Sequence, residues 1–273
     1  KQFSHITPAG QAIIEEAERV LLQIENIRAI AQEFRDEKSG SLSIATTHTQ
    51  ARHALPPVVT AFRKQYPSVS LHMHQGTPMQ IADMAARGAV DFAIATEALE
   101  LFEDLVMLPC YRWNRSIVVP EGHPLTRVQP LTLEEIAKYP IVTYVFGFTG
   151  RSKLDQAFEA KSLKPNVVFT ATDSEVIKTY VGLGLGIGII ASMAFEPERD
   201  HGLVALKADH LFDYSITSIA FRRGIYLRRY MREFIKLFAP HVTDETIERA
   251  ITARTKEERN ALYDELEPRL LYR

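Results

Sequence analysis

The sequence predicts an α/β protein of two Rossmann-like lobes, preceded by one long helix. Three observations carry this prediction. A stretch without Gly or Pro runs from Gln11 to Lys38, strand-like and helix-like segments then alternate in two successive sets, and a strand-like segment at 215–221 leads back to the first set. Such alternation is typical of a parallel sheet with helices on its faces. We expect the first lobe to comprise residues 39–112 and 216–242, and the second lobe residues 113–215.

The long helix comes first in the chain. Thr7 suits an N-cap and Pro8 suits the first helical position, and apolar residues recur at three- and four-residue steps from Ile13 to Ile30. A helix over this stretch is roughly 40 Å long at about 1.5 Å per residue. Its apolar stripe must pack on its own domain or on a second copy of the chain, and its pattern and position favour the second copy.

Strands and helices alternate regularly in the first lobe. The predicted strands lie at 41–46, 69–74 and 91–96, and the predicted helices at 56–66 and 78–87. Prolines open the first of these helices, and Gly88 suits the C-cap of the second.

The second lobe repeats the pattern. Its predicted strands lie at 115–119, 141–144, 167–170, 186–190 and 203–206, and its predicted helices at 133–139, 152–160 and 174–183. The returning strand precedes a helix at 226–238, and the chain crosses between the lobes near 110–113 and 214–218. Residues 243–273 are polar and helix-prone with little to bury, so we predict a weakly packed helical C-terminal tail.

The composition excludes several classes of protein. With 46% hydrophobic and 24% charged residues, the 273-residue chain has the composition of an ordinary soluble globular protein. Its net charge is −2, so the chain as a whole lacks the positive charge that binding to nucleic acid requires. The single cysteine, Cys110, excludes a disulfide scaffold and suits a reducing compartment. No apolar run approaches the ~20 residues that a membrane span needs, so we expect no membrane partner.

Hydroxyl and amide side chains follow several of the predicted strands. The first strand runs into Thr47, Thr49 and Gln50, the third ends at Thr96, and Thr149 follows a strand of the second lobe. In open α/β sheets, ligands lie beyond the carboxyl ends of the strands. Helices that begin just after these ends would add free amide groups and a partial positive charge. The pattern predicts a cleft for a small anion or carboxylate, although any one of these threonines alone could simply cap a helix.

Two other side chains bear on this cleft. The strand ends supply no Lys or Arg except Arg151, so we expect neutral dipoles to hold the ligand. Trp113, in the phrase YRWNR at the crossing, is either part of the hinge core or an aromatic wall of the cleft.

An enzyme or a metalloprotein is disfavoured. The chain has no G-x-S-x-G motif for a serine nucleophile, and the glycine run at 182–188 lacks the third Gly of a dinucleotide fingerprint. The strand ends combine no acid, base and nucleophile. His72 and His74 share one face of a strand, but no third ligand is placed nearby. We therefore expect no catalytic residue, no metal and no cofactor.

Several phrases of the chain resemble a known family. ITPAG before a long helix, followed by SLSIATTHTQARHALPPVVTAFRKQYPSVSLHMHQG, resembles the region after the winged helix-turn-helix of LysR-type transcriptional regulators. THTQAR, DFAIATEAL, FGFTGRS and VIKTYVGLGLG are similar to one branch of that family, the cysteine-regulon activators. The similar phrases extend from Ser41 to about Pro240 and so cover most of the chain.

The resemblance implies a periplasmic-binding-protein-like fold with a ligand cleft between the lobes. Residues 1–38 would hold the end of a DNA-binding wing and a linker helix for dimerisation, and the DNA-reading helix would precede this fragment. It implies a cytoplasmic, homotetrameric regulator of sulfur assimilation and cysteine biosynthesis that responds to N-acetylserine, with sulfate and thiosulfate as opposing effectors. Promoter DNA and RNA polymerase would be partners only of the full-length protein.

The resemblance also assigns roles to residues. Carried onto this sequence, the effector-binding residues are Thr47, Thr49, Gln50, Thr96 and Thr149, with Trp113 lining the cleft. One other class of protein fits the same cleft, namely an extracytoplasmic solute-binding protein for sulfate or a similar small anion. Such a protein should carry a secretion signal and lack a long amphipathic helix running into its first lobe, so the helix at the start of this chain favours the regulator.

Overall fold

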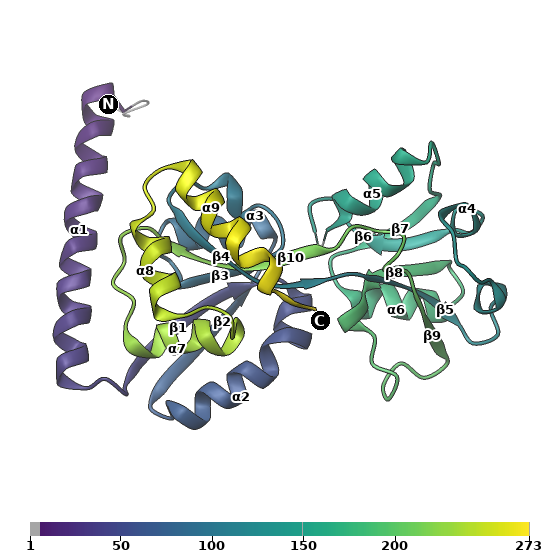
Figure 1. The fold of residues 1–273 in the computed structure, drawn as a ribbon, viewed down its shortest axis with the longest axis horizontal. Coiled ribbons are helices and arrows are strands. Elements are labelled where there is room, and N and C mark those ends of the chain that lie inside the picture. The colour runs from purple at the N-terminus through teal and green to yellow at the C-terminus, as the bar shows by residue number, and fades with distance from the viewer. Residues whose placement is uncertain (1–5, 149, 273) are drawn as a thin grey trace, which may run out of the picture.

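Two α/β lobes, each built on its own sheet, lie next to each other and are joined by neighbouring strands (Figure 1). The computed structural model describes residues 6–148 and 150–272. The predicted fold class, two α/β lobes preceded by a long helix, is confirmed. Residues 1–5, which the resemblance assigns to the end of a wing, lie outside the described residues, as does Thr149.

The sheet of lobe I has six strands in the described part of the chain, in the order β11-β4-β10-β3-β1-β2. These strands are β1 (Gly40–Thr46), β2 (Val69–Gln75), β3 (Phe92–Ala95), β4 (Leu105–Trp113), β10 (Ser215–Arg222) and β11 (Leu271–Tyr272). The sheet of lobe II, counted over the same residues, has five strands in the order β7-β6-β8-β5-β9. These are β5 (Arg115–Pro120), β6 (Ile141–Tyr144), β7 (Val167–Ala171), β8 (Ile187–Ala191) and β9 (Leu203–Lys207).

Both sheets are mixed, whereas the alternation of strands and helices predicted parallel ones. β1 pairs in parallel with β2 and β3, but β10 runs antiparallel to both β3 and β4. In lobe II, β5 runs antiparallel to β8 and β9. The reason is the double connection between the lobes. β4 carries the chain out of lobe I and β10 carries it back, so the paired strands Leu105–Trp113 and Ser215–Arg222 must run in opposite directions.

Helices cover both faces of the sheets, except for the first, which stands at the outer end of lobe I (Figure 1). They are α1 (Pro8–Arg35), α2 (Leu55–Gln65), α3 (Pro78–Ala86), α4 (Leu133–Ile136), α5 (Arg151–Ala160), α6 (Ser174–Gly182), α7 (Arg229–Phe238), α8 (Asp244–Thr252) and α9 (Lys256–Leu266). A π-helical segment, η1 (Gln50–Ala54), leads into α2, and short 3-10 turns lie at η2 (Leu99–Leu101), η3 (Pro124–Arg127), η4 (Ser192–Ala194) and η5 (Glu267–Arg269). Arg87 is the C-cap of α3, and Gly88, predicted for that position, follows it with the left-handed φ of 72° that glycine favours just after a helix.

Alternate residues of β3 build the two faces of the lobe I sheet. Phe92 faces α2 and α7, where its ring lies 6.0 Å from that of Phe234, and Phe62 meets Phe234 at 5.4 Å. Ala93 points to the opposite face and packs in the cluster that contains Ile81 of α3. Side chains of a strand alternate in this way, and burying each aromatic ring stabilises the lobe by roughly 1.5–3 kcal/mol.

Helix α1 leaves its apolar stripe exposed. The Thr7 side chain caps it by accepting from the Gly10 amide at 3.1 Å. Asn26 ties the helix to lobe I by donating to the Gly224 carbonyl oxygen at 2.7 Å. Stripe residues nevertheless remain open, with exposed fractions of 59% for Leu21 and 66% for Ile27. The helix, which stands at the end of the molecule opposite lobe II (Figure 1), therefore leaves much of its apolar stripe exposed in the described structure.

The prediction of a weakly packed C-terminal tail is wrong. Helices α8 and α9 bury Ile247 and Leu266 completely in the core of lobe I. Strand β11 then extends the sheet by pairing in parallel with β4, and Arg112 Nε donates to the Leu270 carbonyl oxygen at 3.2 Å. The sequence concealed this packing because the few apolar residues are widely spaced among charged ones, yet they fall on the inner faces of both helices.

Candidate functional site

The candidate site begins where β1 turns into η1. Thr46 closes the strand by donating its hydroxyl to the Ile94 carbonyl oxygen at 3.1 Å. Thr47, Thr49 and Gln50 follow, and each is at most 5% exposed, whereas His48 between them is exposed. The turn therefore directs three of the predicted site residues inwards, towards the junction of the lobes.

Three predicted site residues meet at one hydroxyl group, that of Thr217 on β10. Gln50 Nε2 and Trp113 Nε1 each donate to Thr217 Oγ1 at 3.1 Å. The Thr96 hydroxyl lies 3.2 Å from the same atom. Two donors occupy both lone pairs of a hydroxyl, so the Thr217 hydroxyl donates a hydrogen bond to the Thr96 hydroxyl. We call Thr47, Thr49, Gln50, Thr96, Trp113 and Thr217 the strand-end cluster.

Trp113 is completely buried. The indole belongs to the core at the crossing. Tyr111, two residues earlier on β4, donates its phenol to Gln50 Oε1, so both ends of the Gln50 amide are held. The orientation of this amide is therefore fixed by groups of β4 and β10, the two strands that join the lobes.

Lobe II reaches the cluster through Tyr144, at the end of β6. Its buried phenol lies beside the hydroxyls of Thr49 and Ser174, and burial raises its pKa. Thr49 Oγ1 is itself buried and makes no hydrogen bond of good geometry to any residue that the structure describes. Buried polar groups are nearly always hydrogen-bonded, and the Tyr144 phenol is the neighbour that engages this hydroxyl, weakly, across the junction of the lobes.

A buried cation lies next to the cluster, and sequence reasoning missed it. Arg115 is 3% exposed, and its guanidinium carbon lies 5.1 Å from the centre of the Trp113 ring. Its Nη2 donates to the Gly150 carbonyl oxygen at 2.5 Å and to Ser215 Oγ at 3.1 Å. The predicted site residue Thr149 lies outside the described residues. The available signal was the position of Arg115, an arginine at the start of a strand directly after the predicted crossing.

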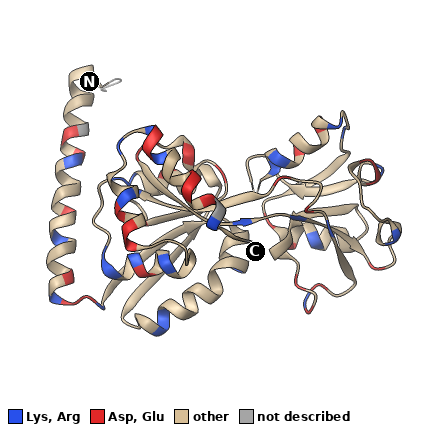
Figure 2. Ribbon diagram, in the orientation of Figure 1, with Lys and Arg blue, Asp and Glu red and all other residues tan. Residues whose placement is uncertain are grey.

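The described residues were also compared with the requirements of a metal site, a membrane span and a charged patch. Within residues 6–148 and 150–272, no group of three His, Cys, Asp or Glu side chains could hold a metal ion. In the same part of the chain, no helix is long and apolar enough to cross a membrane. Figure 2 shows Lys and Arg interleaved with Asp and Glu on α8 and α9. His72 and His74 lie exposed on β2.

Two lobes joined by two strands, with polar side chains buried between them, define a receptor domain for a small molecule. The sequence profile of the LysR substrate binding domain matches residues 35–243. The chain therefore belongs to the LysR-type transcriptional regulators, a non-enzymatic family whose members bind small-molecule effectors and oligomerise.

Individual relatives show which members of the family this chain is similar to. The HTH-type transcriptional regulator CysB of Haemophilus influenzae is 51% identical over 267 residues, which cover 98% of this chain and 82% of that protein. SsuR of Burkholderia cenocepacia is 51% identical over 247 residues, covering 90% of this chain and 80% of that protein. The crystal structure of the cofactor-binding domain of the Cbl transcriptional regulator matches with a TM-score of 0.77 at 45% identity, covering 79% of this chain and 95% of that one.

Proposed function

We propose that the chain is the effector-sensing part of a LysR-type transcriptional activator that controls sulfur assimilation and cysteine biosynthesis. The similarity to regulators named CysB and Cbl supports this assignment. The observation that carries it is the buried Thr49 hydroxyl, which makes no hydrogen bond of good geometry in the described structure and lies beside the Tyr144 phenol, where lobe II meets lobe I.

The proposed ligands are sulfate, thiosulfate and N-acetylserine, all of which are anions at neutral pH. Their contacts would come from the predicted residues Thr47, Thr49, Gln50, Thr96 and Thr149, with Trp113 lining the site. Arg115 adds positive potential from behind the indole ring. Binding would exchange hydrogen bonds, because Gln50 Nε2 now donates to Thr217 and would turn towards the anion. Hydrogen bonds to a charged group are the stronger kind, which favours this exchange.

The proposed signal is the relative orientation of the lobes. A ligand that contacts Thr49 on lobe I and groups of lobe II stabilises one orientation, and it shifts the equilibrium only by its differential affinity for the two states. In this proposal lobe I, residues 39–112 and 216–242 with the tail helices packed on it, moves against residues 113–215. Because DNA half-sites are separated by whole helical turns, a small rotation in the assembled protein changes how its DNA-binding heads fit a promoter.

The exposed stripe of α1 provides the proposed contact for self-association. Its apolar residues lie along one helix, as expected for pairing with the same helix of a second copy. Dimers would then assemble into a homotetramer in the cytoplasm. Promoter DNA and RNA polymerase would be contacted only by the full-length protein.

Thermal melting with a panel of ligands tests the assignment. Sulfate, thiosulfate and N-acetylserine should each raise the melting temperature, while L-alanine at the same concentration serves as the control. A ligand at a hundred times its dissociation constant stabilises the folded state by about 2.7 kcal/mol, which is a shift of about 5 °C in a chain of this size, since the entropy of unfolding is about 2.1 cal/mol/K per residue. If none of the three anions shifts the transition, the sulfur-related assignment is wrong.

A further inference from the structure

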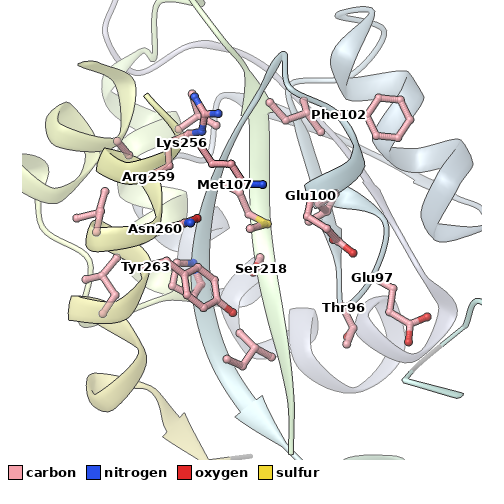
Figure 3. Close-up of a pocket in the computed structure, with 18 of the residues that line it drawn as sticks. Thr96, Glu97, Glu100, Phe102, Met107, Ser218, Lys256, Arg259, Asn260 and Tyr263 are labelled. Atoms are coloured by element: carbon pink, nitrogen blue, oxygen red, sulfur yellow. The ribbon is translucent and has the colours of Figure 1, made fainter. Parts of the chain in front are cut away.

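A cavity lies under helix α9, and apart from Thr96 nothing in the proposed function uses it. We call it the tail cavity. Its volume is about 590 Å³, within the range of about 300–1,000 Å³ that is usual for small-molecule sites. Of the strand-end cluster it touches Thr96 alone (Figure 3). Its floor is apolar and comes from β4 and α9, with Leu105, Met107, Leu262 and Leu266 among the lining residues.

Opposite charges line the two sides of the tail cavity. One wall, from the segment after β3, carries Glu97, Glu100 and Glu103, and the cavity is also lined by Lys153, Lys256 and Arg259. Figure 3 shows Lys256 and Arg259 on the α9 side and Glu97 and Glu100 on the opposite side. Neither Glu100 nor Lys256 forms an ion pair with any residue that the structure describes. These two charged side chains are therefore free to bind a ligand.

Uncharged polar side chains also line the tail cavity. Ser218 is 4% exposed and lines the cavity, yet its hydroxyl makes no hydrogen bond within residues 6–148 and 150–272. Figure 3 shows Asn260 and Tyr263 pointing from α9 into the same space. Burial raises the pKa of Tyr263, which keeps its phenol protonated as a donor at neutral pH. These side chains offer hydrogen-bonding groups to a ligand in the cavity.

We propose that the tail cavity binds an α-amino acid with an apolar side chain, in its zwitterionic form. The carboxylate would face Lys256 and Arg259, the ammonium group would face Glu97 and Glu100, and the side chain would lie on the floor formed by Met107 and Leu262. A simple anion would meet three carboxylates on one wall, and a simple cation would meet three cations elsewhere. Only a molecule that carries both charges is attracted by both walls, because like charges disfavour each other in a partly desolvated site.

The tail cavity is placed to influence the strand-end cluster. Ser152 of lobe II donates to Glu97 Oε1 of lobe I at 2.9 Å, so one of its acidic groups already links the lobes. Thr96, which lines the cavity, lies 3.2 Å from the Thr217 hydroxyl that Gln50 also contacts. An amino acid that draws Glu97 towards its ammonium group changes this link between the lobes and so changes the affinity of the cluster for its own ligand.

Isothermal titration calorimetry with three matched probes tests the proposal on the whole 273-residue chain. L-methionine carries both charges, N-acetyl-L-methionine lacks the ammonium group, and L-methioninamide lacks the carboxylate. We expect L-methionine to bind at least about tenfold more tightly than either blocked analogue, since each lost charge removes a charge-assisted contact. Glu100→Gln should reduce the preference over the N-acetyl analogue, and Lys256→Gln should reduce the preference over the amide. Both side chains are exposed, so neither substitution should unfold the chain.

Glu257→Gln is the matched control, because Glu257 lies on the same helix and is exposed but does not line the cavity. It should leave L-methionine binding unchanged. The proposal is overturned if L-methionine gives no binding heat, if the blocked analogues bind equally well, or if Thr49→Val rather than the cavity variants abolishes binding. It does not rest on the sulfur-related assignment, since sulfate binding to the strand-end cluster should survive Glu100→Gln and Lys256→Gln.

Discussion

Nδ1 of His53 lies 3.1 Å from Oε1 of Glu196, across the junction between the lobes. His53 belongs to η1 in lobe I, and Glu196 follows η4 in lobe II. The imidazole is 3% exposed, and next to it Arg52 forms an ion pair of 3.2 Å with Glu175. These contacts hold the two lobes together beside the strand-end cluster, at a site where a change of charge alters their association.

The first prediction concerns pH. Burial lowers the pKa of His53 and outweighs Glu196 and Glu175, which raise it, while Lys178 and Arg52 lower it further. In the unfolded chain the pKa is about 6.5, so between the two pKa values the unfolded state binds more protons. Stability should therefore be complete above about pH 6.5 and should fall as the pH drops towards the folded-state pKa.

His53→Gln tests this dependence. The variant should lose part of the decrease in unfolding free energy on acidification, measured by urea denaturation between about pH 5 and 8. His72→Gln, on the exposed side of β2, is the control and should retain the whole dependence. An unchanged slope for His53→Gln would show that this histidine does not sense pH.

The second prediction concerns Gly150, whose φ of +68° already disfavours other residues. A Cβ atom there would lie 2.0 Å from Arg115 Nη2. Gly150→Ala should displace the Arg115 guanidinium and destabilise the fold by several kcal/mol, as is usual when a buried hydrogen-bonded charge loses its partners. Gly147→Ala is the matched control, because its φ of +79° is similar but no atom lies within 4 Å. It should cost only about 1–2 kcal/mol. Equal losses in urea denaturation would contradict the role given to Arg115.

The third prediction concerns the C-terminal tail. Leu266→Ala removes a completely buried side chain at the end of α9 and should cost about 2–5 kcal/mol of unfolding free energy. Leu271→Ala provides the comparison, since Leu271 is 56% exposed, and it should cost less than about 1 kcal/mol. Chemical denaturation measures both. A neutral Leu266→Ala would mean that α9 is only loosely attached to lobe I.

The fourth prediction concerns the stripe of α1. Leu21→Glu places a charge at a position that is 59% exposed in the single chain but buried in the proposed helix pair. The substitution should dissociate the oligomer, as measured by sedimentation velocity, because an unpaired charge is disfavoured in an apolar contact. Gln23→Glu adds the same charge at another exposed position of the helix and should leave the assembly intact. An oligomer that survives Leu21→Glu would place the contact elsewhere.

Local sequence patterns predicted most helices and strands of this fold but not all of the strand pairings. The Thr7-Pro8 start of α1, the left-handed Gly88 just after α3 and the return of β10 each depend on a few neighbouring residues, and the structure contains all three. The antiparallel β4 was not predicted, because its last four residues, 110–113, coincide with the predicted crossing. Its pairing with β10 joins segments about a hundred residues apart, which no local pattern reports.

In the strand-end cluster, too, some residues could be predicted from local sequence and others depend on distant partners. Gln50, Thr96 and Trp113 could be selected because polar groups at strand ends and an aromatic residue at a crossing are typical of ligand sites. The group that joins them, Thr217, lies inside a strand and has no local signature. Arg115 was missed for a similar reason, since its partners Gly150 and Ser215 come from distant parts of the chain.

The most direct test of the central claim is the dissociation constant of sulfate for Thr49→Val, measured by titration calorimetry beside the parent chain. Valine has the shape of threonine without its hydroxyl, and Thr49 Oγ1 forms no hydrogen bond of good geometry in the described structure, so stability should be preserved. Losing a donor to a charged ligand, about 1.5–3 kcal/mol, should weaken sulfate binding at least tenfold. Thr60→Val, on the exposed side of α2, should bind as the parent does. Sulfate binding that is equally tight in the parent and in Thr49→Val would contradict the assignment of the strand-end cluster as the effector site.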